Sequence, residues 1–442
     1  MEDPQLWRWA VIRVEATNLG EVLASNRVRA VRSLLYDGGG RGGGGENARI
    51  TTDNLRLILN FLLRSDFVLK SLKMRTFLEN NSENSSLLAQ IVCQVEEVDL
   101  QELQLRCDLV TFSEVFSQIA TTQNIKLKSL NITGVNLLGV WGDSLSKAVN
   151  RIEEVKMSGV RMLPEQLHNI LNIFLAGGSF LKSLDLSRAI NIPLERHLLS
   201  QTVANLVEVN LSDVGCPMLD INALLSDIIE RDRSQVALKK LLISGIDVSH
   251  VSSTTLSEVA SRLESLGLSR TNLLGLHVTE LFSRITGATK LRLKELDIGG
   301  NNLHLVRKPD ILAKVVSRLI NVNLWRTNLN QEQIKCLFEE IIKTETLRLR
   351  SLNISQNDLS SLSPAVFSQA VSRLEEVRMF KCRIAPTASS YGSYSLPHHD
   401  CYFQQLSDSP GNLRVLLGNF SLSHRIIGKL SVQLYKFSHS FL

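Results

Sequence analysis

The sequence predicts an α/β solenoid in which short parallel strands alternate with helices. The first reason is a short pattern that recurs along the chain: an apolar residue, two variable residues, a second apolar residue, one variable residue and a third apolar residue. The last two apolar positions are two apart, so both point to one side of a strand. The copies begin at Leu69, Val95, Leu127, Ile152, Leu181, Leu206, Leu238, Leu263, Leu293, Leu319, Leu349 and Leu374.

The second reason is the helical periodicity between the copies. Successive starts are separated by 25 to 32 residues, and short and long separations alternate, so the larger unit is a pair of about 56 residues. Apolar residues at offsets 0, 3, 4 and 7 form one helical face in each gap, as in Leu256, Val259, Ala260 and Leu263. One strand and one helix bury a core only by stacking on their neighbours. We therefore expect a horseshoe with parallel strands on its concave side and helices on its convex side.

A fuller pattern, LxxLxLxx(N/C/T)xL, is complete at Leu293–Leu303 and Leu349–Leu359. It resembles the leucine-rich repeats of the ribonuclease-inhibitor-like class, and the resemblance covers residues 50–384 with about twelve repeats. In that class the polar residue turns inward and bonds backbone groups. It is occupied here by Thr271, Asn301, Asn357 and Cys382. Val135, Val160 and Ile246 replace it elsewhere, so those turns require another solution.

The residue after each first apolar position alternates in charge along the chain. Adjacent parallel strands lie about 4.8 Å apart, so opposite charges are expected to face each other. Exposed pairs contribute only about 0–1 kcal/mol each, which favours a role in register and solubility over a binding site. The residues are Lys70, Glu96, Lys128, Glu153, Lys182, Val207, Lys239, Glu264, Lys294, Ile320, Arg350 and Glu375.

The first 36 residues lack the repeat spacing and are predicted to form an N-terminal cap. Pro4, Leu6 and Trp7 resemble the motif that closes an F-box and leads into leucine-rich repeats in the F-box/LRR family. The resemblance implies helices before Pro4 that would grip a Skp-type adaptor. They are absent from this sequence, so adaptor binding is expected only if an F-box lies upstream, as in a truncated gene model. The alternative is that Trp7 and Trp9 belong to an amphipathic cap over the first repeat.

Three further segments depart from the repeat. Residues 37–46, DGGGRGGGGE, are predicted to be a flexible loop, and they lack the Lys-Ser/Thr of a phosphate-binding loop. Residues 385–412 are predicted to be an irregular loop, and residues 413–442 a degenerate C-terminal repeat or cap beginning near Leu413. We expect no metal site in that loop, because adjacent side chains alternate in direction and no second ligand cluster exists. The potential ligands are His398, His399, Asp400 and Cys401.

Composition narrows the classes of partner and compartment. The 442 residues carry a formal net charge of +5, with basic and acidic residues interleaved, which favours neither nucleic acid nor a membrane surface. Six cysteines form no CxxC motif, as expected for reduced thiols. The N-terminus lacks the regions of a signal peptide, and no apolar run approaches the roughly 20 residues that span a bilayer. We expect a cytoplasmic or nuclear protein.

The expected function is that of a protein-binding scaffold. No nucleophile elbow, HExxH motif or Gly-rich dinucleotide loop occurs, so neither an enzyme nor a cofactor is predicted. The F-box/LRR resemblance implies a substrate-recognition protein of a cullin-type ubiquitin ligase, with the repeats holding the substrate. The alternative is a stand-alone leucine-rich-repeat regulatory or receptor-type module with no link to ubiquitin.

The predicted binding site lies in the C-terminal half of the concave face. Trp325 and Phe380 interrupt the polar residues expected there, beside Asn323 and Arg378. Exposed aromatics and arginine on a rigid surface are typical of interface hot spots. The alternative is that Trp325 folds over a neighbouring strand and Phe380 packs under the loop that follows it. The N-terminal half offers only small or charged side chains at these positions, so we expect the partner protein to bind at these four residues.

Overall fold

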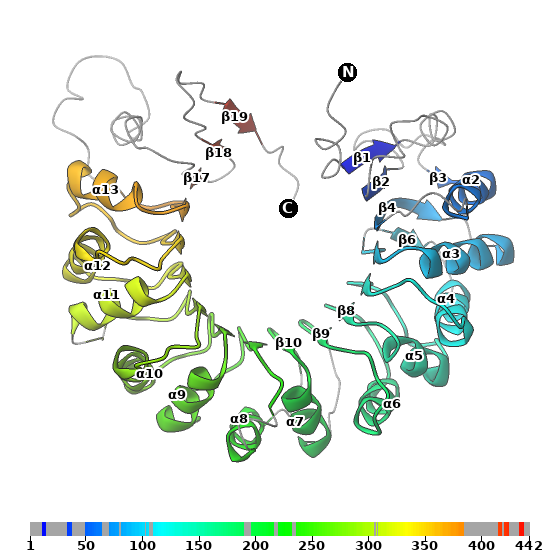
Figure 1. The fold of residues 1–442 in the computed structure, drawn as a ribbon, viewed down its shortest axis with the longest axis horizontal. Coiled ribbons are helices and arrows are strands. Elements are labelled where there is room, and N and C mark those ends of the chain that lie inside the picture. Colours follow the sequence, from blue (N-terminus) through cyan, green and yellow to red (C-terminus); the bar gives the residue numbers. More distant parts are fainter. Residues whose placement is uncertain are drawn as a thin grey trace. The chain divides into compact units, whose positions relative to one another are not determined.

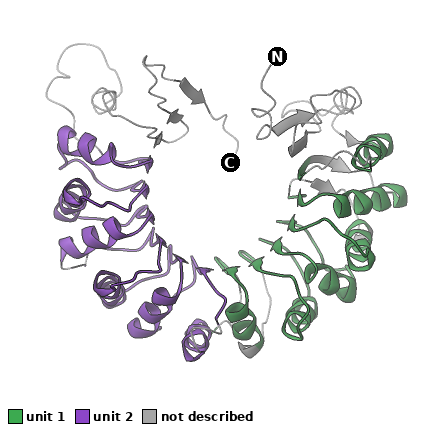
Figure 2. Ribbon diagram, viewed as in Figure 1, with its two compact units in different colours: residues 1–220 green, residues 221–442 purple. Residues whose placement is uncertain are grey.

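A computed structural model divides the chain into two compact units, unit 1 (residues 1–220) and unit 2 (residues 221–442) (Figures 1 and 2). In each unit, short strands line one face and helices cover the other (Figure 1). The predicted α/β leucine-rich-repeat solenoid is confirmed by this alternation. The described residues are 11–14, 33–37, 49–63, 70–78, 81–101, 103–105, 109–189, 196–215, 220–231, 236–304, 306, 308–383, 414–417, 420–423 and 433–436.

Unit 1 contains one parallel sheet with a short second sheet beside it. The strands of the parallel sheet are, in spatial order, β1 (Val11–Val14), β2 (Ser33–Asp37), β4 (Ser71–Leu78), β5 (Glu97–Asp99), β7 (Ser129–Asn131), β8 (Glu154–Lys156), β9 (Ser183–Asp185) and β10 (Glu208–Asn210). The far end of β4 also pairs with β3 (Arg49–Ile50) and β6 (Leu103–Leu105). The helices are α2 (Thr52–Leu62), α3 (Ser82–Gln94), α4 (Leu109–Thr121), α5 (Gly142–Val149), α6 (Pro164–Leu175) and α7 (Arg196–Asn205).

Unit 2 repeats this arrangement and ends in antiparallel strands. Its parallel strands are β11 (Lys240–Leu242), β12 (Ser265–Gly267), β13 (Glu295–Asp297), β14 (Asn321–Asn323), β15 (Ser351–Asn353), β16 (Glu376–Arg378) and β17 (Arg414–Leu417). The antiparallel strands are β18 (Phe420–Ser423) and β19 (Gln433–Lys436). The helices are α8 (Ile221–Glu230), α9 (Ser253–Arg262), α10 (Gly275–Gly287), α11 (Pro309–Arg318), α12 (Gln331–Lys343) and α13 (Pro364–Val371).

The repeat pattern predicts the strands to the residue. Each of the twelve predicted copies has its strand two residues after the predicted start, as with Leu293 and β13. The apolar face of each helix packs against the inward residues of the strands. Leu312, Val315 and Val316 of α11, for example, are at most 1% exposed. Burying a side chain of this size stabilises the fold by roughly 1.5–3 kcal/mol.

The ends of the chain depart from the predicted segmentation. β1 and β2 continue the parallel sheet, with Val11 opposite Ser33 and Ser33 opposite Ser71, so the strand pattern begins before residue 50. Starts at residues 9 and 31 would fit their register, but the resulting spacings of 22 and 38 residues lie outside the 25–32 rhythm, which hid them. At the other end, Arg414 pairs with Glu376, which places β17 one residue earlier than a copy starting at Leu413 would.

From β7 to β16, every strand leads into the same turn. The residue seven positions after each predicted start has a positive φ, from Gly134 (+78°) to Lys381 (+52°). Only some of these residues are glycine, so the turn holds several L-residues in a conformation that they rarely adopt. The turn directs the next residue inward, toward the core.

The inward residue closes the turn in two different ways. The Oδ1 atom of Asn301 accepts from the backbone N–H groups of Thr271 and Leu273, at 3.1 Å each, and its Nδ2 donates to the carbonyls of Leu268 (2.6 Å) and Ile298 (3.0 Å). Asn357 makes the corresponding bonds one pair later. This confirms the inward role that the resemblance implied.

The apolar replacements close the turn with backbone bonds alone. The N–H of Val160 donates to the carbonyl of Met157 at 3.3 Å, and the N–H of Leu137 donates to the carbonyl of Arg161 in the next loop at 2.7 Å. Cys382 is intermediate between the two solutions, because its thiol donates to the carbonyl of Ile354 at 3.3 Å. Burial raises the pKa of Cys382 to about 11, so the thiol stays protonated as that donor requires.

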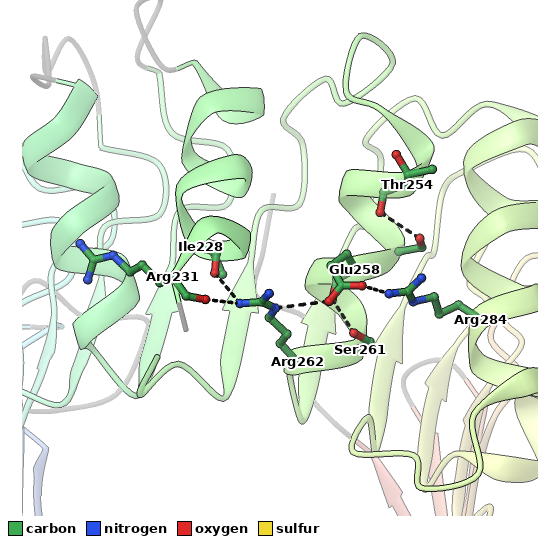
Figure 3. A network of polar contacts seen from close by, with 8 residues as sticks. Ile228, Arg231, Thr254, Glu258, Ser261, Arg262 and Arg284 are labelled. Atoms are coloured by element: carbon green, nitrogen blue, oxygen red, sulfur yellow. Dashed lines mark hydrogen bonds and ion pairs between the residues drawn. The ribbon is translucent and has the colours of Figure 1, made fainter. Parts of the chain in front are cut away.

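An arginine before a strand caps the C-terminus of the helix one repeat earlier. The guanidinium of Arg262 donates to the carbonyls of Ile228 (3.0 Å) and Arg231 (2.7 Å) at the end of α8 (Figure 3). Glu258 holds this guanidinium by an ion pair at 3.5 Å and pairs with Arg284 on its other side (Figure 3). Helix C-termini leave carbonyls without partners and attract positive charge, so the arginine satisfies both.

The same cap recurs at the period of the repeat pair. Arg318 donates to the carbonyls of Ile285, at 2.7 Å, and of Thr286 and Ala288. The set consists of Arg151 in unit 1 and Arg262, Arg318 and Arg373 in unit 2. The spacings of 56 and 55 residues within unit 2 were visible in the sequence, although the sequence analysis did not use them.

Candidate functional site

The candidate site lies on the strand-lined face of unit 2, defined here as the three residues of each repeat that point away from the core. The strand register sets them in three rows. The first row is Lys240, Ser265, Glu295, Asn321, Ser351 and Glu376. The central row is Leu242, Gly267, Asp297, Asn323, Asn353 and Arg378. The last row is Ser244, Ser269, Gly299, Trp325, Ser355 and Phe380.

This face contains an open depression of about 830 Å³ lined by β11 to β16. Gly267 contributes to its shape, because a Cβ atom there would lie 2.7 Å from the Cδ2 atom of Leu242. The absence of a side chain at Gly267 therefore allows Leu242 to lie across β12. The sequence analysis did not single out these two residues, since neither is polar or aromatic.

The structure brings the four predicted site residues onto three neighbouring strands. Asn323 and Arg378 occupy the central row of β14 and β16, with Asn353 of β15 between them. Trp325 and Phe380 follow two residues later, and Ser355 separates them. The Oγ atom of Ser355 accepts from the backbone N–H of Phe380 at 2.9 Å. Asn353 and Ser355 are thus part of the same surface, although the sequence analysis did not name Ser355.

The aromatic side chains are partly exposed. Phe380 is 36% exposed, and the ammonium of Lys381 lies 5.2 Å from its ring centroid. Trp325 is half-buried, since a Cβ atom at Gly300 would lie 3.3 Å from its Cζ3 atom. The alternative expectation for Trp325 therefore holds in part, because the ring leans over the neighbouring repeat. The loop expected to cover Phe380 lies outside the described residues, and the site assignment stays a prediction.

Local hydrogen bonds fix the central-row side chains. The Oδ1 atom of Asn323 accepts from the N–H of Trp325 at 3.0 Å, and that of Asn353 accepts from the N–H of Ser355 at 3.1 Å. Asp297 bonds the N–H of Gly299 in the same way at 3.0 Å. These side chains end each strand by satisfying the first free backbone N–H after it. Their orientation is therefore set before any partner binds.

Ion pairs between neighbouring repeats follow the predicted charge alternation. Lys128 pairs with Glu96 (3.3 Å) and Lys182 with Glu153 (2.7 Å). In unit 2, Lys294 pairs with Glu264 (2.5 Å), and Arg350 pairs with Glu375 (3.2 Å). These pairs are exposed, so their contribution is about 0–1 kcal/mol each.

Several other predictions fall outside the described residues. The motif of Pro4, Leu6 and Trp7, most of the Gly-rich segment and the 385–412 loop are among them. Within the described ranges, no group of three or more His, Cys, Asp or Glu residues is placed to hold a metal ion. Among the helices described, none has the length and apolar character needed to cross a membrane.

Comparison with known proteins concerns the fold alone. No protein-family model matches the chain, and no curated protein matches its sequence. The chain is similar to a solved structure, the leucine-rich repeat-containing protein LegL7 from Legionella pneumophila, at 14% identity. That match covers 80% of this chain and 95% of LegL7, with a TM-score of 0.35. On the evidence of its own repeat pattern, strand register and turn geometry, the chain is a leucine-rich-repeat solenoid.

Proposed function

We propose that the chain is a protein-binding scaffold whose partner docks on the strand-lined face of unit 2, at Asn323, Trp325, Arg378 and Phe380. The observation that supports this is the grouping of two partly exposed aromatic rings with an exposed arginine beside an open depression. Aromatic and arginine side chains dominate the energetics of protein interfaces.

The rigidity of the surface favours binding. The strands are fixed by backbone bonds to both neighbours, and the central-row amides are fixed by the turns that follow them. A surface that is already ordered loses little conformational entropy on association. The free energy gained by burying Trp325 and Phe380 is therefore largely available for affinity.

The test is affinity capture of a partner with the full chain, followed by binding measurements on single variants. Trp325→Ala and Phe380→Ala should each weaken binding by at least about 2 kcal/mol, or roughly 30-fold. Asn131→Ala, at the central row of β7 in unit 1, serves as the control. If that control weakens binding as much as the aromatic variants do, the assignment of the site to unit 2 is wrong. Thermal unfolding of each variant separates lost binding from lost folding.

We further propose that the scaffold is a substrate receptor of the F-box/LRR kind. The support is the resemblance of Pro4, Leu6 and Trp7 to the end of an F-box. Against it, Trp9 stands two residues before β1 and fits the first apolar position of a repeat, as the stand-alone alternative would have it. Immunoprecipitation of the natural protein from its source cells should recover a Skp-type adaptor and a cullin. Recovery of the partner without either would favour the stand-alone module.

A further inference from the structure

We infer that this surface recognises an acidic side chain next to a large apolar side chain, within a segment of the partner protein. The inference rests on the proposed function and specifies the chemistry of its ligand. Three features of the described residues support it: unused hydrogen-bond donors, an arginine fork aimed outward, and a small buried residue between two aromatic rings.

The donors outnumber the acceptors on this part of the face. The Oδ1 atoms of Asn323 and Asn353 are already occupied by backbone N–H groups, and the Oγ atom of Ser355 accepts from Phe380. The Nδ2 groups of the two asparagines make no hydrogen bond within the described part of the chain. A partner that contacts them must therefore supply acceptors, because an unpaired donor buried at an interface costs free energy.

Arg378 identifies the acceptor as a carboxylate. Its Nε atom donates to Glu376 at 2.6 Å, which holds the side chain by one edge. The two Nη groups are unused, and the side chain is 54% exposed. A guanidinium edge with two parallel N–H groups fits the two oxygens of a carboxylate better than it fits a single carbonyl. Lys381, over the Phe380 ring, adds a second positive charge at the same edge.

The apolar part of the ligand would lie over Ser355. This residue is 4% exposed and forms the floor between Trp325 on one side and Phe380 on the other. The two rings stem from strands two spacings apart, or about 10 Å. This gap accommodates one large apolar side chain flanked by aromatic faces, while the neighbouring acid reaches Asn353 and Arg378.

The acidic residues of the depression set the direction of the ligand. Glu375 and Glu376 are paired with Arg350 and Arg378, so they leave little net charge at β16. Glu295 and Asp297 lie together on β13 and would repel an acidic group there. The acidic side chain is therefore favoured at the β15–β16 end of the surface.

The experiment is selection of displayed random linear peptides on the full chain. Wild type should enrich sequences with Asp or Glu next to Leu, Ile, Met, Phe or Trp. Arg378→Glu should lose that preference and enrich Lys or Arg at the same position. Lys156→Glu is the matched control, because Lys156 holds the equivalent place on β8 and pairs with Glu154 on its own strand at 3.0 Å. It should select the same peptides as wild type.

A selected acidic peptide then gives a quantitative test. Arg378→Gln should weaken its binding about 10- to 100-fold, since a hydrogen bond to a charged group contributes about 1.5–3 kcal/mol. Failure to enrich any peptide, an acidic preference that survives Arg378→Glu, or an equal effect of Lys156→Glu would each overturn the inference. If the natural partner is lost with Trp325→Ala but not with Arg378→Glu, the docking site stands and only its acidic ligand is rejected.

Discussion

The strand-lined faces of the two units are built from the same repeat but differ in how their side chains are satisfied. In unit 1 the polar residues satisfy one another: Lys73 pairs with Asp99 at 2.6 Å, and Asn131 donates to Gln101 at 3.2 Å. In unit 2 the corresponding amides of Asn323 and Asn353 keep an unused donor beside two aromatic rings. A surface whose groups are already paired gains little from a partner. The difference therefore indicates which face binds, and a few residues create it.

The turns that follow the strands differ in a similar way. In unit 1 the inward position of β7 to β10 is apolar, as Val135, Val160, Ala189 and Val214, and the turns close by backbone bonds. From β12 onward it is polar, and Asn301 and Asn357 each connect two repeats. Unit 2 thus supports its binding face with side-chain hydrogen bonds that unit 1 lacks.

The largest expected effect comes from giving unit 2 the solution used in unit 1. Asn301→Val should lower the free energy of unfolding by about 3 kcal/mol, because it leaves the N–H groups of Thr271 and Leu273 without acceptors. Val160→Ala in unit 1 should cost about 1–2 kcal/mol through lost apolar burial alone. Amide hydrogen exchange at Thr271 and Leu273 should accelerate only in Asn301→Val. Unchanged exchange there would remove the distinction between the two kinds of turn.

A feature that the units share should respond equally in both. Arg318→Ala in unit 2 and Arg151→Ala in unit 1 should each lose about 2 kcal/mol of stability, since each arginine bonds several helix-terminal carbonyls. Arg318→Lys should recover little of the loss, because an ammonium cannot span carbonyls as the guanidinium does. Denaturant unfolding measures this. Full recovery by lysine would show that charge alone is responsible.

A smaller effect tests the support of Trp325. Gly134→Ala in unit 1 should cost about 1 kcal/mol, because φ is +78° there and no atom lies within 4 Å of the added Cβ. Gly300→Ala in unit 2 should cost more, since its Cβ would lie 2.6 Å from the side chain of Arg270 and 3.3 Å from the Trp325 ring. The two variants are compared by thermal unfolding. Equal losses would mean that Gly300 does not shape the site.

The smallest effect is expected from the charge alternation. The hydrogen bond from Lys294 lowers the pKa of Glu264 below its usual 4.5. A carboxyl whose pKa is lower in the folded state contributes stability above its unfolded pKa, and the contribution is lost as the pH falls through the folded value. Glu264→Gln should therefore cost less than about 1 kcal/mol at neutral pH and nothing in strong acid. A pH-independent difference from wild type would exclude the Lys294 pairing as its cause.

The sequence was sufficient for the strands and the inward polar row, because both follow from apolar spacing that recurs many times. It did not reveal β1 and β2, whose spacing is interrupted by the Gly-rich segment, or the register of β17. For the site, Trp325 and Phe380 stood out because aromatics are rare in that row. The contributions of Ser355 and Gly267 arise from small size, and the unused donors of the asparagines depend on hydrogen-bond geometry. Neither leaves a pattern in a single sequence.

The arginine caps also limit how such a chain can grow or shrink. Each arginine stands at the end of one helix but completes the helix before it, so the two helices form a single functional module of about 56 residues. Deleting one helix and its strand would separate a guanidinium from its carbonyls and leave both without partners. Duplication or loss of whole pairs preserves every cap. The length of the solenoid is therefore expected to change in steps of two repeats, both in natural lineages and in shortened versions made by design.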